Sequence, residues 1–248
     1  MSALKPLIAG NWKMVGLPAD LKSFADAMRA WSGGSRGGLL ICPPATLLAA
    51  AVQAFDGLPI AVGGQDCHAK ASGAHTGDIA APMIAAAGGT FVIVGHSERR
   101  ADHGETDAQV KAKAEAALAA GLTPIICIGE SLAQRQAGET LAVVEASLRG
   151  SLPSGDLARV VVAYEPVWAI GTGLTANADQ IAEVHAHLRK VLLSIDGTGA
   201  AVKLLYGGSV KPGNAAEILA TPDVNGVLVG GASLVAADFQ AIASACPA

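Results

Sequence analysis

Short runs of apolar, often β-branched residues recur along the chain, and each is followed by a turn and an alanine-rich stretch with helical spacing. There are eight such runs, beginning at Pro6, Gly38, Pro59, Thr90, Thr123, Arg159, Lys203 and Gly226. Spread over 248 residues, they leave about 31 residues for each unit, enough for a strand, two loops and a helix. Most runs are apolar on both faces, which predicts parallel strands covered on both sides.

Several of the intervening stretches carry helical signals. Apolar residues between Leu17 and Trp31 follow steps of three and four, and Pro18 falls in the first turn, where its missing N–H costs little. The stretch 106–109 reads as a capping box that opens a helix, with Gly121 as its natural stop. Another apolar stripe runs through residues 181–195.

These units favour a single α/β domain over residues 1–248, built as a closed (β/α)8 TIM barrel with a helix after each of its eight parallel strands. No Pro/Ser-rich linker, charge block or low-complexity tail divides the chain. A doubly wound open sheet is the rival architecture, and periodicity alone leaves both open.

The composition first raises the question of a membrane protein. Hydrophobic residues make up 51% of the chain and charged residues 15%, against about 25% charged in typical soluble domains. The two longest uncharged windows, Gly37–Phe55 and Ile79–Gly95, are interrupted by prolines and, in the second, by a glycine pair. Neither offers the roughly 20 unbroken apolar residues that a spanning helix needs. Strands buried on both faces under alanine-rich helices explain the apolar excess instead.

Charge and cysteine usage narrow the remaining classes. A formal charge of -4 argues against a nucleic-acid partner. Four cysteines without a CxxC pair fit reduced packing residues rather than a disulfide framework or a zinc site. Lys5, Asn11 and Lys13 interrupt the first apolar segment, so no signal peptide is evident and we expect a cytoplasmic protein.

Polar side chains and glycine turns follow the predicted strands, at the edge where parallel α/β folds place their chemistry. They are Asn11, Lys13, His96, Ser97, Glu98, Glu165, Ser209, Gly230 and Gly231. Taken one at a time, these residues have plainer interpretations: Lys13 is a solvated lysine, His96 is a structural histidine and Glu165 caps a loop. Glycine turns, however, expose N–H groups that bind anions. Together the residues suggest a small anionic substrate, one base and one electrophile.

Four segments resemble the triosephosphate isomerase family. They are GNWKM from Gly10, VGHSERR from Val94, AYEPVWAIGTG from Ala163 and YGGSV from Tyr206, in the family's order. The likeness covers essentially the whole chain. It implies a (β/α)8 barrel that interconverts dihydroxyacetone phosphate and D-glyceraldehyde 3-phosphate through an enediolate, in glycolysis and gluconeogenesis, with no metal and no other cofactor.

The resemblance also implies roles for single residues. Glu165 matches the catalytic base, and His96 matches the electrophile that polarises the carbonyl oxygen. Asn11 and Lys13 match catalytic residues beside the substrate oxygens, and Lys13 supplies positive charge. The implied phosphate ligands are Asn11, Lys13, Gly171, Ser209, Gly230 and Gly231.

Ser97 and Glu98 match secondary positions of the family's site, and for Glu98 an ion-pair partner of Lys13 is the plainer explanation. Residues 166–176 resemble the family's mobile lid, with Pro166 stiffening one hinge. Leu174 stands where the family usually has lysine. This departure bears on the opening and closing of the lid rather than on proton transfer.

Residues 65–78 are predicted to form a long loop, which by its composition alone would be a mobile surface loop. By resemblance, its part 73–78, including Thr76, enters a neighbouring subunit, so we expect a homodimer. Asp66 and Asp78 replace the family's usual asparagine and glutamate, and the shorter Asp78 weakens the expected ion pair between subunits.

Other function classes fit less well. A serine hydrolase would need a glycine where Arg99 follows GHSE, and no nucleotide-binding glycine motif occurs. A metal aldolase would need His185 and His187 to converge, whereas a helix makes them diverge, and we expect both to be exposed. A non-catalytic phosphate-binding homologue should have lost Glu165 or His96, and both are present.

Overall fold

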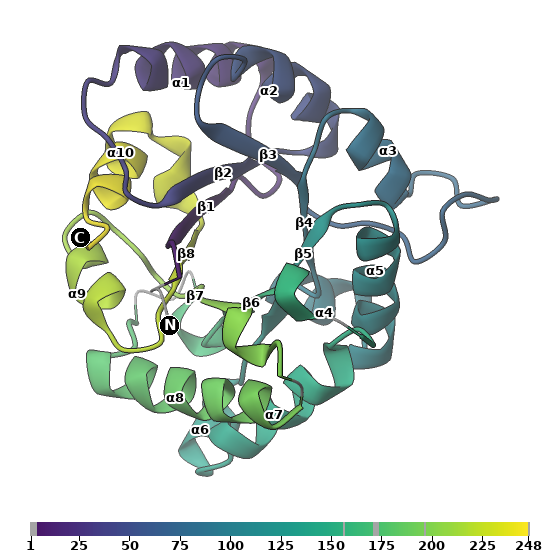
Figure 1. The fold of residues 1–248 in the computed structure, drawn as a ribbon, viewed down its shortest axis with the longest axis vertical. Coiled ribbons are helices and arrows are strands. Elements are labelled where there is room, and N and C mark those ends of the chain that lie inside the picture. The colour runs from purple at the N-terminus through teal and green to yellow at the C-terminus, as the bar shows by residue number, and fades with distance from the viewer. Residues whose placement is uncertain (1–3, 156, 171–173, 196, 248) are drawn as a thin grey trace.

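The computed structural model describes residues 4–155, 157–170, 174–195 and 197–247. In this part of the chain, eight parallel strands pair in chain order, and β1 bonds to both β2 and β8, which closes the barrel seen end-on in Figure 1. This closure excludes the open sheet. The strands are β1 (Leu7–Asn11), β2 (Gly38–Cys42), β3 (Ile60–Gly64), β4 (Phe91–Val94), β5 (Thr123–Ile128), β6 (Val161–Tyr164), β7 (Lys203–Tyr206) and β8 (Gly226–Val229).

Helices form the outer ring around these strands (Figure 1). They are α1 (Pro18–Ala30), α2 (Leu48–Ala54), α3 (Ala81–Ala86), α4 (Ser97–His103), α5 (Asp107–Ala119), α6 (Leu132–Gln136), α7 (Thr140–Ser151), α8 (Ala178–Ile195), α9 (Ala215–Ala220) and α10 (Ala236–Ser244). Each predicted run contains one strand, and each gap between successive strands contains at least one helix. No described helix combines the length and apolarity needed to cross a membrane.

Alternate residues of the strands enter two separate apolar clusters. Leu7 and Ala9 pack inside the barrel with inward residues of the other strands, whereas Ile8 joins the layer between strands and helices. Both layers are almost entirely buried. The predicted two-sided burial of the strands is therefore confirmed, and its outer layer is what the amphipathic helices cover.

The helix signals are confirmed, except for the burial of two terminal residues of the predicted apolar stripes. Thr106 and Gln109 make the reciprocal bonds of a capping box at α5, and Gly121 follows the helix with a φ of 84°. Leu17 is 68% exposed because it precedes α1 with extended backbone, where helical spacing does not apply. Ile195, the last residue of α8, is 40% exposed.

Candidate active site

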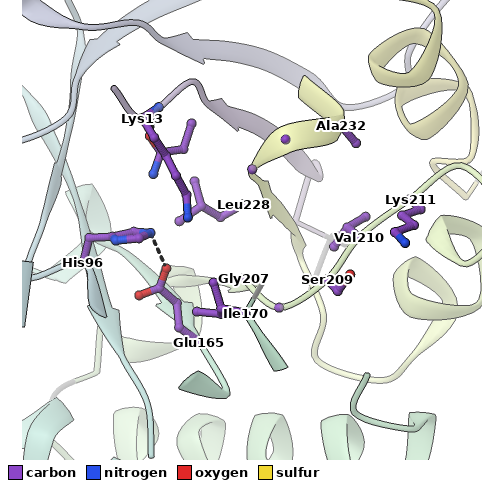
Figure 2. A pocket seen from close by; sticks show the side chains of 14 residues that line it. Lys13, His96, Glu165, Ile170, Gly207, Ser209, Val210, Lys211, Leu228 and Ala232 are labelled. Atoms are coloured by element: carbon purple, nitrogen blue, oxygen red, sulfur yellow. Dashed lines mark hydrogen bonds and ion pairs between the residues drawn. The ribbon is translucent and has the colours of Figure 1, made fainter. Parts of the chain in front are cut away.

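A cavity of about 280 Å³ lies where five of the strands end. Figure 2 shows Lys13, His96 and Glu165 pointing toward one another at one side, with Ser209 and Lys211 farther along the pocket. The sequence-predicted residues that line the cavity are Asn11, Lys13, His96, Glu165, Ser209, Gly230 and Gly231. Gly171 lies outside the described residues. One pocket thus gathers side chains that are more than 200 residues apart in sequence.

The end of β1 holds Lys13 in an unusual backbone conformation. Its φ is 53°, a left-handed value that costs a non-glycine residue on the order of 1 kcal/mol or more. Oδ1 of Asn11 accepts the Lys13 N–H at 3.0 Å, and the Gln65 amide donates to the Lys13 carbonyl at 2.8 Å. Trp12 points the other way, into the outer core. These bonds fix the turn that aims Lys13 into the pocket.

Glu98 is the ion partner of Lys13. The Lys13 ammonium lies 2.5 Å from Oε1 of Glu98, and both side chains are partly exposed. The predicted pairing of these two residues is therefore confirmed, although Glu98 does not line the central cavity.

His96 is oriented by the first turn of α4. The Glu98 N–H donates to Nδ1 of His96 at 3.2 Å, and Nε2 lies 3.0 Å from Oε1 of Glu165. Because Nδ1 accepts a bond, the proton of the neutral ring lies on Nε2. His96 therefore presents an N–H donor to the interior of the pocket.

Glu165 is 2% exposed, yet its surroundings favour the charged form. Burial raises the pKa of Glu165, but the His96 ring, the Ser97 N–H at 3.0 Å and the Lys13 charge outweigh it, so the pKa is lowered from its usual value. Burial likewise lowers the pKa of His96, but the Glu165 carboxylate reverses this and raises it. Each group thus stabilises the charged form of the other.

Glycines bring the last two strands close to this pair. A Cβ on Gly207 would lie 2.9 Å from Cγ of Glu165, so no larger residue fits without displacing the carboxylate. Gly230 and Gly231 line the same cavity, and a short 3₁₀ helix, Gly231–Leu234, begins there. Small residues with backbone N–H groups suit the approach of an anion such as phosphate.

Comparison with known proteins agrees with this geometry. The family model described as triosephosphate isomerase matches residues 6–246. The chain belongs to the triosephosphate isomerase family. Triosephosphate isomerases of Ruegeria pomeroyi and Bradyrhizobium diazoefficiens are 63% and 60% identical to it, over 97% and 99% of both chains. The solved triosephosphate isomerase of Bartonella henselae has a TM-score of 0.89 and 46% identity, and the match covers 98% of this chain and 99% of that one.

One buried residue that supports the site and that sequence reasoning missed is Glu130. It is fully buried, and its Oε1 accepts bonds from the Tyr164 hydroxyl at 3.1 Å and from Nε1 of Trp168 at 2.9 Å. Trp168 belongs to the segment 166–176 that resembles the lid of the family. The signal was present, because Glu130 follows the apolar run of β5 just as Glu165 follows that of β6.

Lys211 was missed as well, and it adds a second cation to the cavity lining beyond Ser209. A sequence signal for this lysine is weak, because it stands in a polar turn where most lysines are solvated. Its charge reinforces the suitability of this side of the pocket for an anion.

Two expectations outside the pocket have different outcomes. His185 is completely buried, so its predicted exposure was wrong, because this face of α8 packs against the ring of Tyr164. His187 contacts Glu145 instead, so the two imidazoles do diverge.

Thr76 is exposed in the loop between β3 and α3, which projects from the ring of helices in Figure 1 and contributes nothing to the cavity.

Proposed function

We propose that this chain interconverts dihydroxyacetone phosphate and D-glyceraldehyde 3-phosphate by proton transfer through an enediolate, as in glycolysis and gluconeogenesis, with Glu165 as the base. The observation that supports this best is a buried carboxylate 3.0 Å from an imidazole N–H donor, in a pocket that also holds Lys13. A carboxylate base and a donor to the carbonyl oxygen are the two groups that the reaction requires. The family is itself a standard example of this chemistry.

Substrate binding must replace the contact between Glu165 and His96, because both groups are needed on the substrate. The carboxylate would then face the carbon-bound proton, and Nε2–H of His96 would face the carbonyl oxygen. Without the direct contact of Glu165, burial and the Lys13 charge lower the pKa of His96, opposed by the Glu98 carboxylate beside Nδ1. The neutral imidazole is thus the form that polarises the carbonyl.

Charge that develops on the substrate oxygens would be stabilised by Asn11 and Lys13. Removing one preorganised donor of this kind costs about 10²- to 10³-fold in rate. The phosphate group would lie toward Gly171, Ser209, Gly230 and Gly231, with Asn11 and Lys13 on its near side. The glycine-lined end of the cavity supports this orientation.

Closure of residues 166–176 would keep water from the enediolate, which otherwise loses phosphate. Glu130 supports this role, because its bond to Trp168 anchors the first part of the segment. Pro166 precedes the 3₁₀ turn Val167–Ala169, and Ile170 reaches the cavity wall.

We further propose a single-domain, cytoplasmic enzyme that forms a homodimer through the projecting loop around Thr76 and needs no nucleic-acid partner or membrane. The exposed loop around Thr76, which projects from the ring of helices, supports this assembly. Asp78 lies 3.9 Å from His68 of its own chain, which competes with an ion pair between subunits.

A coupled isomerase assay with and without EDTA tests the function. We expect rapid turnover of either triose phosphate that is unaffected by the chelator, because every proposed catalytic group is a side chain of the protein. Absence of turnover, or its loss in EDTA, would contradict the proposed mechanism and favour a metal-dependent reaction on the same barrel.

A further inference from the structure

The loop between β3 and α3 contains a cluster of metal-binding side chains that plays no part in the proposed isomerase chemistry. One ligand atom each of His68, His75 and Asp78 can be chosen so that all three lie within 4.8 Å of one another. Nε2 of His68 is 3.9 Å from Oδ2 of Asp78, and the two imidazole rings lie 4.0 Å apart, centroid to centroid. They border a cavity of about 360 Å³.

The stem of this loop holds two of the three residues in place. The His68 N–H donates to the Ile79 carbonyl at 2.8 Å, and His68 pairs with Ala80 as an isolated parallel bridge. His68 and Asp78 therefore stand at the two ends of the loop. His75 returns from near its tip to face them.

We propose that His68, His75 and Asp78 bind a divalent transition metal ion, with Zn²⁺ the best-suited ion. Two imidazoles and one carboxylate match the donors that zinc, cobalt and nickel prefer, whereas magnesium and calcium prefer oxygen ligands alone. Three protein ligands leave a fourth tetrahedral position for water.

The cluster must contract to bind the ion. Zinc bonds of about 2.0–2.2 Å place tetrahedral ligand atoms roughly 3.4 Å apart. A separation of up to 4.8 Å must therefore close by as much as about 1.4 Å. Gly73 and Gly77, on either side of His75, have φ values of 145° and 94° and give the loop this freedom.

Binding also changes the tautomer of His68. The Lys70 N–H donates to Nδ1 of His68 at 3.0 Å, so the proton of the neutral ring faces Asp78 from Nε2. A metal at Nε2 moves that proton to Nδ1 and ends the Lys70 bond, and the Lys70 ammonium near the cavity opposes the added charge. The site is therefore of moderate affinity, and its occupation reorganises the backbone at Lys70.

The ion would join both ends of the loop to the residue beside its tip, and so order the segment around Thr76. None of the three residues lines the catalytic pocket of the same chain. An effect on assembly rests on the proposed homodimer, whereas metal binding itself does not.

Calorimetric titration of the untagged, EDTA-treated protein with Zn²⁺ at neutral pH tests the site, and the absorption bands of Co²⁺ report its coordination. We expect one ion per chain and Co²⁺ bands of four-coordinate geometry. His75→Ala and Asp78→Asn should each weaken binding at least about tenfold, because each removes one of three ligands. His103→Ala, which removes an exposed imidazole at the end of α4, should leave the affinity unchanged.

Circular dichroism and thermal unfolding of each variant show that the barrel has folded. Failure of the wild-type protein to bind Zn²⁺, or equal affinity in the His75→Ala variant, would overturn the site. Sedimentation analysis measures the oligomeric state separately from metal binding. A chain that binds Zn²⁺ but stays monomeric would support the site and contradict the proposed homodimer.

Discussion

Two buried histidines lie on opposite sides of the end of β6, and their surroundings shift their pKa values in opposite directions. His96 faces Glu165 in the catalytic pocket, and the nearby carboxylate raises its pKa. His185 lies in the helix layer behind Tyr164, with ring centroids 6.0 Å apart, and burial lowers its pKa to about 4. Tyr164 and Glu165 are consecutive, so one step along the backbone separates the two environments.

The difference between the two pKa shifts comes from the group that each imidazole contacts rather than from how deeply each is buried. Both histidine residues are at most 5% exposed. His185 contacts the carbonyl of Asp223 at 3.2 Å, and its Nε2 has no hydrogen-bond partner among the described residues. Burial therefore outweighs this bond and the Asp223 carboxylate, which offset only part of the cost of a buried charge. His96 has a carboxylate at 3.0 Å that opposes burial more strongly. The barrel thus keeps one imidazole neutral for packing and couples the other to a base.

Removing the carboxylate should have the largest effect on activity. Glu165→Gln is expected to lower kcat by about 10²- to 10⁴-fold, the usual value of a positioned base, while binding of a substrate analogue remains measurable. Glu217→Gln, at an exposed position on α9, serves as the matched control. Unchanged turnover in the purified Glu165 variant would contradict its assignment as the base.

Removing the neutral imidazole should change acid stability instead. Between pH 6.5 and about 4 the unfolded chain protonates at His185 while the folded chain does not, so stability falls as the pH decreases across this window. The shift corresponds to about 3 kcal/mol. His185→Asn keeps a donor toward Asp223 and should flatten this part of the curve, measured by urea unfolding at several pH values. An equally steep decline in the variant would show that His185 titrates normally.

The smallest effect is expected at the lid, away from both histidines. Leu174→Lys restores the residue usual in the family at a position that is half exposed. We expect kcat and the loss of phosphate from the intermediate to change by less than about threefold, because a hinge residue affects opening rather than proton transfer. A tenfold or larger change in either quantity, in steady-state kinetics, would show that Leu174 controls closure.

Most of the fold could be predicted from local patterns. All eight strands lie within the predicted runs, because residues buried on both faces leave a continuous apolar signal. Closure of the barrel could not be predicted in this way, since the pairing of β1 with β8 joins residues about 220 positions apart. It was the resemblance of four motifs to a known family that favoured the barrel over an open sheet.

Site residues that follow the predicted strands could be predicted from the sequence. Positions that depend on tertiary packing could not. His96 and Glu165 lie within two residues of the ends of β4 and β6, so the topology brings them together. The burial of His185 depends on which face of α8 meets Tyr164, and the approach of His75 to His68 depends on how a loop folds back. Neither the burial of His185 nor the approach of His75 to His68 can be predicted from helical spacing or loop composition.

The central claim, that the Glu165 carboxylate opposes burial and raises the pKa of His96, is tested most directly by an NMR titration of the imidazole nitrogens in the wild-type protein and in Glu165→Gln. The pKa of His96 should fall in the variant, where only the Glu98 carboxylate opposes burial and the Lys13 charge, whereas His185 should stay neutral down to about pH 4 in both proteins. A pKa of His96 that does not change on loss of the carboxylate would contradict the account.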